Sequence, residues 1–367
     1  MARIRYAIIG LGHIAQAAML PAFAHARRNS ALVALISNDR EKLERLGRRY
    51  KVKNLCHYEA AEQLFHSGEI DSLYIALPNS RHAQWAIKAM QAGVHVLCEK
   101  PMATTAQECE RMLRAARKAR VRLMIAYRLH FERANLEAAQ IVRSGTLGEP
   151  RYFNAQFSQQ VPVGNIRLDG KLGGGPLWDI GIYCINAARS SFAAEPTRVW
   201  ATANSRRDRR FREVPETVTA VLEFPGQRVA SINCSFGAAD RSRYEIVGTK
   251  GSLVVDPAFH YAEGLGYQLE IGKRRKVKTF ARSDQFAAEL VYFSDCVQKK
   301  REPEPSGEEG MIDVAIIEAL HRSIRTGKWV SLARVANRKR RPSLRQEIRR
   351  PAVPREPKLV KAKAPHA

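Results

Sequence analysis

Residues 4–15 read Ile4-Arg5-Tyr6-Ala7-Ile8-Ile9-Gly10-Leu11-Gly12-His13-Ile14-Ala15. The mostly apolar run 4–9 predicts a buried strand, and a helix is predicted from about His13. Between them, Gly10, Gly12 and Ala15 match the spacing G-x-G-x-x-G/A, in which small residues permit a tight turn, backbone approach to a pyrophosphate and close helix–strand packing. A glycine-rich turn can arise by chance. At this place in a strand–turn–helix unit we interpret it as a dinucleotide-binding turn, with the helix N-terminus facing the phosphates.

The same alternation of strands and helices continues to residue 127. Further strands are predicted at 32–37, 72–77, 94–98 and 123–127, and helices at 81–91 and 105–119. Continuous apolar strands separated by helices are typical of βαβ units with a parallel sheet. Residues 1–127 are therefore predicted to form a Rossmann domain, and the fold class is α/β.

The pattern changes after residue 127, and a chain of 367 residues is too long for one ordinary core. Helices are predicted at about 132–144, 178–192, 283–300 and 308–326, and strands at 151–159, 198–203, 217–224, 228–236, 241–247 and 252–255. Successive strands joined by tight turns favour an open, mostly antiparallel sheet. We expect residues 128–332 to form a C-terminal α+β domain for substrate binding and oligomerisation.

Much of the formal net charge of +25 lies near the C-terminus. From residue 333 onward, twelve lysines and arginines stand against two glutamates. This composition cannot form a core, so residues 333–367 are expected to be a basic, disordered, solvated tail that catalysis does not need. The alternative is a weak contact with a polyanion such as nucleic acid, because blocks of like charge often act as electrostatic arms.

Composition also argues against several classes of protein. No apolar run approaches the ~20 residues that cross a bilayer. The apolar run that ends at Gly10 is shorter than that of a signal peptide, so a cytoplasmic location is expected. The six cysteines contain no C-x-x-C pair, which speaks against a disulfide framework or a structural zinc site. No metal site is predicted.

The end of the second strand bears on the choice of cofactor. NAD-binding sites place Asp or Glu there to accept the ribose 2′-OH, whereas this chain has Ser37. Arg40 and Lys42 follow closely and can neutralise a 2′-phosphate. The alternative is a plain Asn38-Asp39 helix cap with Lys42 in solvent. The pattern favours NADP over NAD.

Three residues form a candidate proton-transfer group. Lys100 follows the strand at 94–98, at the carboxyl edge of the sheet where ligands bind. Asp179 and Tyr183 are spaced i, i+4 on a predicted helix and share one face. A lysine ammonium near a phenol stabilises the phenolate, which suits proton exchange with a substrate. Ordinary packing of Asp179 and Tyr183 is the alternative.

Several motifs together resemble one known family. They are the turn at 10–15 and the segments 76–82 (ALPNSRH), 99–101 (EKP), 126–128 (AYR), 173–183 (GGGPLWDIGIY) and 307–311 (GEEGM). The chain resembles the glucose–fructose oxidoreductase/inositol dehydrogenase (Gfo/Idh/MocA) family from residue 5 to about 332. It is most similar to the glucose–fructose oxidoreductase branch, which has Tyr at the position of Tyr183 where most members have His.

The resemblance implies roles for individual residues. Lys100, Asp179 and Tyr183 would be catalytic, with Tyr183 exchanging the substrate hydroxyl proton. The segment 37–42 matches the way in which that branch holds NADP, and Ile166-Arg167 stands where the branch has Trp-Arg. The implied cofactor contacts are Gly10, Gly12, His13, Ile14, Ser37, Asn38, Lys42, Tyr58, Leu77, Asn79, His82, Glu99, Lys100, Arg128 and Arg167.

Three histidines invite a catalytic interpretation. By its place in the segment 76–82, His82 is expected to be a neighbour of the cofactor rather than an acid or base. His95 lies inside a predicted strand and is expected to be a core residue with satisfied hydrogen bonds. For His130, the sequence does not decide between a catalytic and a structural role.

These observations predict an NADP(H)-dependent oxidoreductase that acts on a sugar, polyol or related carbonyl compound. A homo-oligomer, dimer or tetramer, is expected through the open C-terminal sheet. The alternatives are an NADP-binding sensor without turnover, a redox-neutral family member that cleaves glycosides and keeps its cofactor bound, and a polyanion-binding protein acting through its tail.

Overall fold

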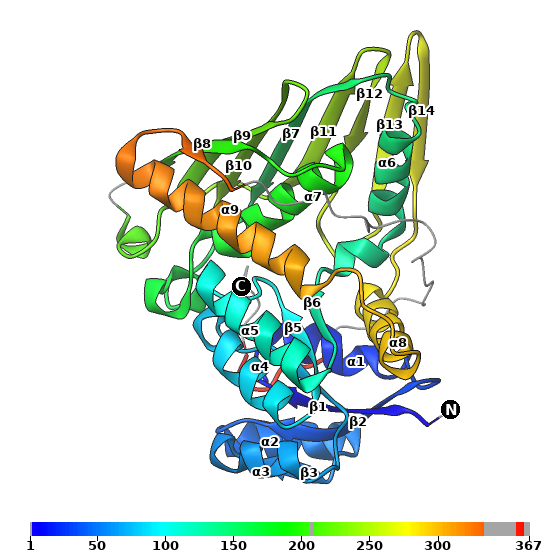
Figure 1. Ribbon diagram of the computed structural model, residues 1–367, viewed down its shortest axis with the longest axis vertical. Coiled ribbons are helices and arrows are strands. Elements are labelled where there is room, and N and C mark those ends of the chain that lie inside the picture. The colour runs from blue at the N-terminus through cyan, green and yellow to red at the C-terminus, as the bar shows by residue number, and fades with distance from the viewer. Residues whose placement is uncertain (1, 206–207, 334–356, 363–367) are drawn as a thin grey trace.

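The computed structural model describes residues 2–205, 208–333 and 357–362. An N-terminal and a C-terminal domain stack along the long axis of the molecule (Figure 1). Residues 334–356 and 363–367 of the predicted disordered tail lie outside the described residues.

The N-terminal domain is a six-stranded parallel sheet in the order β3-β2-β1-β4-β5-β6. The strands are β1 Ile4–Ile9, β2 Ser30–Ile36, β3 Asn54–Cys56, β4 Ser72–Ile75, β5 His95–Glu99 and β6 Leu123–Ala126. The strand order reverses between β1 and β4, which creates the crevice at the carboxyl ends where Rossmann domains bind dinucleotides. The expected Rossmann fold is confirmed. The three-residue β3 was not predicted, since it is too short to show a periodicity.

The helices of this domain are α1 Leu20–Ala22, α2 Arg40–Tyr50, α3 Ala61–His66, α4 His82–Gln91 and α5 Ala106–Ala119. The helix predicted from His13 is less regular than expected, because a π-helical stretch, Ala15–Met19, precedes the short α1. Pro21 lies at the start of α1 and has no N–H to continue the hydrogen-bond ladder. The N-termini of α2 and α5 are capped by the side chains of Asp39 and Thr105.

The C-terminal domain is built on a nine-stranded sheet in the order β14-β13-β12-β11-β7-β10-β9-β8-β15. The strands are β7 Pro150–Ser158, β8 Arg198–Asn204, β9 Thr217–Phe224, β10 Arg228–Ser235, β11 Arg241–Gly248, β12 Gly251–Val255, β13 Gly266–Ile271, β14 Arg274–Thr279 and β15 Val330–Ser331. All pairs are antiparallel except β7 with β10, which confirms the expected mostly antiparallel sheet. The sheet extends beyond the predicted strands through β13–β15. Among them, β14 is largely exposed and charged and therefore lacks an apolar alternation.

Three helices lie along one face of this sheet: α6 Arg133–Arg143, α7 Ile182–Phe192 and α9 Gly307–Thr326 (Figure 1). A buried ionic cluster joins α7 to α9. Arg189 is 0% exposed and binds Asp313 at 2.6 Å, Glu309 at 3.0 Å and Glu195 at 2.5 Å. Because Tyr183 lies on α7, this cluster holds the helix that carries a candidate catalytic residue.

One helix from the second half of the chain belongs to the first core. Helix α8, Gln285–Gln298, packs on the Rossmann sheet, where the Ser294 hydroxyl lies 2.8 Å from the hydroxyl of Tyr6. The side chains of Leu290 and Phe293 join the same apolar cluster as β1. No helix among the described residues is long and apolar enough to span a membrane.

Candidate active site

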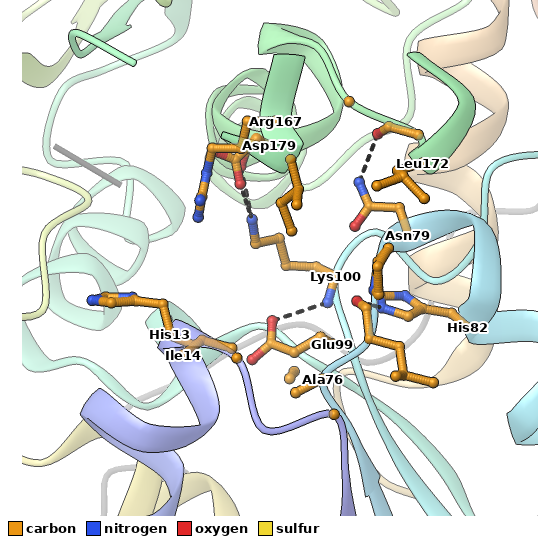
Figure 2. A pocket seen from close by; sticks show the side chains of 18 of the residues that line it. His13, Ile14, Ala76, Asn79, His82, Glu99, Lys100, Arg167, Leu172 and Asp179 are labelled. Carbon is orange, nitrogen blue, oxygen red and sulfur yellow. Dashed lines mark hydrogen bonds and ion pairs between the residues drawn. The ribbon is translucent and has the colours of Figure 1, made fainter. Parts of the chain in front are cut away.

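A cavity of about 390 Å³ lies at the carboxyl ends of β1, β4 and β5, where the two domains meet. Figure 2 shows side chains from both domains directed into it, with Lys100 near its centre. All but one of the predicted site residues line this cavity. These are Gly10, Gly12, His13, Ile14, Ser37, Lys42, Tyr58, Leu77, Asn79, His82, Glu99, Lys100, Arg128, Arg167, Asp179 and Tyr183.

Asn38 is the exception, because it does not line the cavity. Its side-chain Oδ1 accepts a hydrogen bond from the backbone N–H of Tyr58, 3.0 Å away. Asn38 therefore holds together the loops that follow β2 and β3, and Tyr58 itself lines the cavity.

The glycine turn has the shape that a dinucleotide needs. Gly10 has φ +90°, and a Cβ there would lie 2.5 Å from the carbonyl oxygen of Ala76, so a larger residue is excluded. A Cβ on Gly12 would meet nothing within 4 Å, which leaves its backbone open toward the cavity. The residues present therefore fit a bound pyrophosphate.

Ser37 and Lys42 lie at one end of the cavity, around the start of α2. The Ser37 hydroxyl accepts from the backbone N–H of Asp39 at 3.1 Å, and Asp39 accepts from the N–H of Lys42 at 3.1 Å. The Asp39 cap foreseen in the alternative interpretation therefore exists. Lys42 nevertheless lines the cavity. Serine and lysine here suit a ribose carrying a 2′-phosphate.

The Lys100 ammonium is held by the start of the helical segment that carries Tyr183. Its Nζ donates to the backbone oxygen of Asp179 at 2.8 Å and lies 3.3 Å from Asp179 Oδ1. Arg167 binds the other carboxylate oxygen at 2.6 Å. The three side chains are only 10–26% exposed.

In this group, charge pairing has a larger effect on the pKa values than burial has. Burial alone would raise the pKa of Asp179, but Arg167 and Lys100 hold it well below its usual range. Burial would lower the pKa of Lys100, but Tyr183, Asp179 and Glu99 raise it above its usual value. Lys100 and Asp179 are therefore both ionised at neutral pH.

Tyr183 lies one turn beyond Asp179, as the spacing predicted. The Lys100 ammonium is 4.8 Å from the centre of its ring, and the Arg128 guanidinium carbon is 5.0 Å from it. The rings of Phe157 and Phe259 flank it at 5.8 and 6.1 Å. A phenol held between two cations and two apolar rings has a defined position and an electropositive environment, which suits a group that exchanges protons.

Glu99 forms part of the cavity floor. It accepts hydrogen bonds from the Tyr74 hydroxyl at 2.5 Å and from the backbone N–H of Lys100 at 3.2 Å. Burial raises its pKa in spite of the neighbouring Lys100. These contacts fix the start of the segment that carries the lysine.

The three histidines have different environments. The ring nitrogens of His82 lie 2.8 Å from the carbonyl oxygens of Pro101 and Leu77, so this buried ring links the loops after β4 and β5. His95 accepts from the backbone N–H of Arg122 at 2.8 Å, as expected of a structural residue, but it is half-buried at the first residue of β5 rather than in the core. His130 lies behind the site, where its Nε2 is 2.7 Å from Asn186 Oδ1.

Several cavity residues were not predicted from the sequence. They lie at the end of β7, just after it and on the segment between β12 and β13, and comprise Phe157, Gln159, Phe259, His260 and Tyr261. Gln159 donates to Asp179 Oδ2 at 3.4 Å. No short motif marks these positions. The alternation of β7, which places every second residue on the helix-covered side, was the one available signal. The described residues contain no cluster of three or more potential metal ligands.

Comparisons with known proteins cover both domains. Residues 4–127 match the Gfo/Idh/MocA oxidoreductase family model, described as an NAD-binding Rossmann fold, and residues 135–254 match the GFO/IDH/MocA C-terminal domain. The D-xylose 1-dehydrogenase (NADP(+)) of Haloarcula marismortui is 32% identical over 337 residues, covering 90% of this chain and 93% of that protein.

Solved structures show the same architecture. The aldose-aldose oxidoreductase from Caulobacter crescentus, complexed with glycerol, superposes with a TM-score of 0.86 at 36% identity, covering 90% of this chain and 100% of that one. A 3-ketoreductase from Actinomadura kijaniata, in complex with NADP and TDP-benzene, superposes with a TM-score of 0.79 at 27% identity, covering 88% and 98%.

Proposed function

The chain belongs to the Gfo/Idh/MocA oxidoreductase family, and from that premise we propose that Tyr183, Lys100 and Asp179 form its proton-transfer group. The protein is an NADP-dependent oxidoreductase of a sugar, polyol or related carbonyl compound, as its relatives indicate. The observation that carries the assignment of residues is the position of Lys100, which contacts the face of the Tyr183 ring while Asp179 holds it.

The cavity residues divide into three groups around the cofactor. The turn 10–14 would hold the pyrophosphate, Ser37 and Lys42 the 2′-phosphate, and residues near Lys100 the nicotinamide end. NADP, when bound, supplies or accepts the hydride. Gly12 leaves room for backbone N–H groups to bind phosphate oxygens, because a Cβ there would meet nothing within 4 Å, whereas Gly10 lets the turn pass close to Ala76.

In our proposal Tyr183 moves the proton of the substrate hydroxyl. A secondary alcohol that is oxidised must lose its hydroxyl proton, and a positioned group is worth roughly 10²–10⁴-fold in rate. Lys100 stabilises the phenolate form through its charge. Asp179, held by Arg167, keeps the ammonium of Lys100 in place.

The second-domain side of the cavity supports a polyhydroxylated substrate. The aromatic rings of Phe157, Phe259 and Tyr261 line it together with the polar Gln159 and His260. Aromatic faces pack on the C–H faces of a sugar, and the amide and imidazole can bind its hydroxyls. Of the cations at this end, Lys100 and Arg167 both bind Asp179. Arg128 binds the side-chain oxygen of Gln285 and the carbonyl oxygen of Phe259.

The test begins with native mass spectrometry of the full chain, which reports any cofactor that remains bound. A panel of aldoses, polyols and ketoses is then followed at the nicotinamide absorbance with added NADP or NADPH. Turnover of at least one uncharged sugar or polyol is expected. NADP binding with no turnover across the panel would instead support the sensor alternative.

Two further properties stay proposals. The sheet face opposite α6, α7 and α9 carries exposed side chains such as Tyr152, at 44% exposure, which supports association through this face. We propose a homo-oligomer formed there, to be checked by light scattering. A cytoplasmic location is proposed as well, to be checked by cell fractionation.

A further inference from the structure

A short segment near the C-terminus, residues 357–362, lies against the Rossmann domain. Its Val360 is 1% exposed and belongs to the apolar cluster that contains Leu11 and Leu43. The side chain of Gln16, itself 0% exposed, binds both main-chain groups of Val360: Oε1 accepts from its N–H at 2.7 Å, and Nε2 donates to its carbonyl at 2.9 Å. This part of the tail is therefore docked, which corrects the expectation that all of residues 333–367 would be disordered.

The same segment contacts both ends of α2. Near the end of the helix, Arg49 donates to the carbonyl oxygen of Lys358 at 2.7 Å. At its start, Lys361 Nζ lies 2.8 Å from Glu41 Oε2 and 3.8 Å from Asp39 Oδ1. The segment thus connects the helical stretch after the glycine motif, through Gln16, to both ends of α2.

The start of α2 is also one end of the cofactor cavity. Ser37 and Lys42 line the cavity on either side of Asp39, and Asp39 is hydrogen-bonded to both. Asp39 and Glu41 suit a helix N-terminus, but two carboxylates there oppose the approach of a dianionic phosphate. Lys361 pairs with both carboxylates, and Glu41 has a second ion pair, with Arg45 at 2.9 Å.

We propose that the segment 357–362 supports the NADP site from outside the cavity and that Lys361 favours NADP over NAD by neutralising Asp39 and Glu41. The proposal rests on the NADP dependence of the enzyme. Lys361 acts through the two carboxylates and is a positioning residue rather than a catalytic one. Removal of its charge should lower the affinity for ligands that carry a 2′-phosphate and leave the affinity for other ligands unaffected.

The test is a binding assay on the full chain, with no turnover involved. Dissociation constants are measured by calorimetry for NADPH, NADH and 2′,5′-ADP with wild type and Lys361→Gln. Exposed charge pairs of this kind contribute modestly, so NADPH and 2′,5′-ADP should bind about three- to tenfold more weakly in the variant. NADH should change less than about twofold, and raised ionic strength should shrink the NADPH effect.

Two further variants isolate the mechanism. Glu41→Gln added to Lys361→Gln should recover part of the lost NADPH affinity, because one of the two carboxylates that Lys361 contacts is gone. Lys53→Gln removes the same charge from an exposed position just before β3, at the amino ends of the strands. It should leave all three dissociation constants unchanged. The proposal would be overturned if the ratio of the dissociation constants for NADPH and NADH were the same in Lys361→Gln as in wild type. It would also be overturned if adding Glu41→Gln restored no NADPH affinity. Because 2′,5′-ADP binding needs no substrate, these outcomes are distinct from a failure of the proposed catalysis.

Discussion

Replacement of Tyr183 by Phe removes a single hydroxyl from the proposed proton-transfer group. The ring would keep its contacts with the Lys100 ammonium, the Arg128 guanidinium and the flanking Phe157 and Phe259. Fold and cofactor affinity should therefore be preserved. Lys100 Nζ is held by two oxygens of Asp179, at 2.8 and 3.3 Å, so it is poorly placed to take over the proton. We expect kcat to fall by roughly 10²–10⁴-fold, which corresponds to about 3–5 kcal/mol in the barrier.

The assay is steady-state turnover of the best substrate at saturating NADP, with the dissociation constant of NADPH measured in parallel. Tyr183→His should recover part of the rate, because imidazole can exchange the same proton. Lys100→Met should cost at least as much as Tyr183→Phe, since the charge that stabilises the phenolate is lost. Tyr152→Phe removes the same group from the open sheet face and should retain wild-type kcat. A near-wild-type rate in Tyr183→Phe would refute the assignment of the proton transfer to this residue.

Three other predictions address the cofactor, the pH dependence and the assembly. Ser37→Asp should place a carboxylate against the 2′-phosphate and reverse the preference for NADP, measured as the ratio of kcat/KM for the two cofactors; an unchanged ratio would contradict the role given to Ser37. Burial, with Arg122, lowers the pKa of His95 from 6.5 to about 4. Between these two pH values the imidazole takes up a proton in the unfolded chain but not in the folded one, so the free energy of unfolding decreases as the pH falls. His95→Asn keeps an acceptor for the Arg122 N–H but cannot titrate, and its urea midpoint should vary less than that of wild type between pH 6.5 and 4; equal slopes would exclude the histidine as the cause. Tyr152→Arg should dissociate the proposed oligomer in light scattering without loss of the far-UV circular dichroism signal, and an unchanged mass would place the interface elsewhere.

Much of the fold could be predicted from local patterns. The strands at 4–9 and 217–224 were placed to the residue, because they are regular and bounded by clear turns. The irregular π-helical stretch 15–19 and the three-residue β3 were missed, since neither carries a full period of its own structure. Helix α8 was placed correctly along the chain, but its packing against the Rossmann core could not be seen, because an apolar face does not specify its partner.

The cofactor half of the site was predictable for a different reason. The glycine turn, Ser37, Lys42 and Lys100 follow strand ends, and in a parallel sheet such positions gather at one edge whatever the rest of the chain does. The other cofactor contacts were implied by the resemblance to the family. The substrate half comes from strands and loops distant in sequence, such as Gln159 and His260, and no local signal relates those two positions. Likewise, the i, i+4 spacing predicted that Asp179 and Tyr183 share a helix face. It could not show that Arg167 and Lys100 bind different carboxylate oxygens of Asp179.

The sequence by itself determined the dinucleotide turn, the order of the strands along the chain and the residue types at the carboxyl edge, because each depends on steric demands within a few neighbouring residues. Only the tertiary structure decided which cation pairs with which carboxylate, which polar groups are buried and where the C-terminal segment docks. Composition alone predicted residues 357–362 to be solvated, whereas Val360 is buried beside Gln16 and Lys361 pairs with Glu41. Such contacts join residues hundreds of positions apart, and their strength depends on distance and exclusion of water, which exist only once the chain has folded.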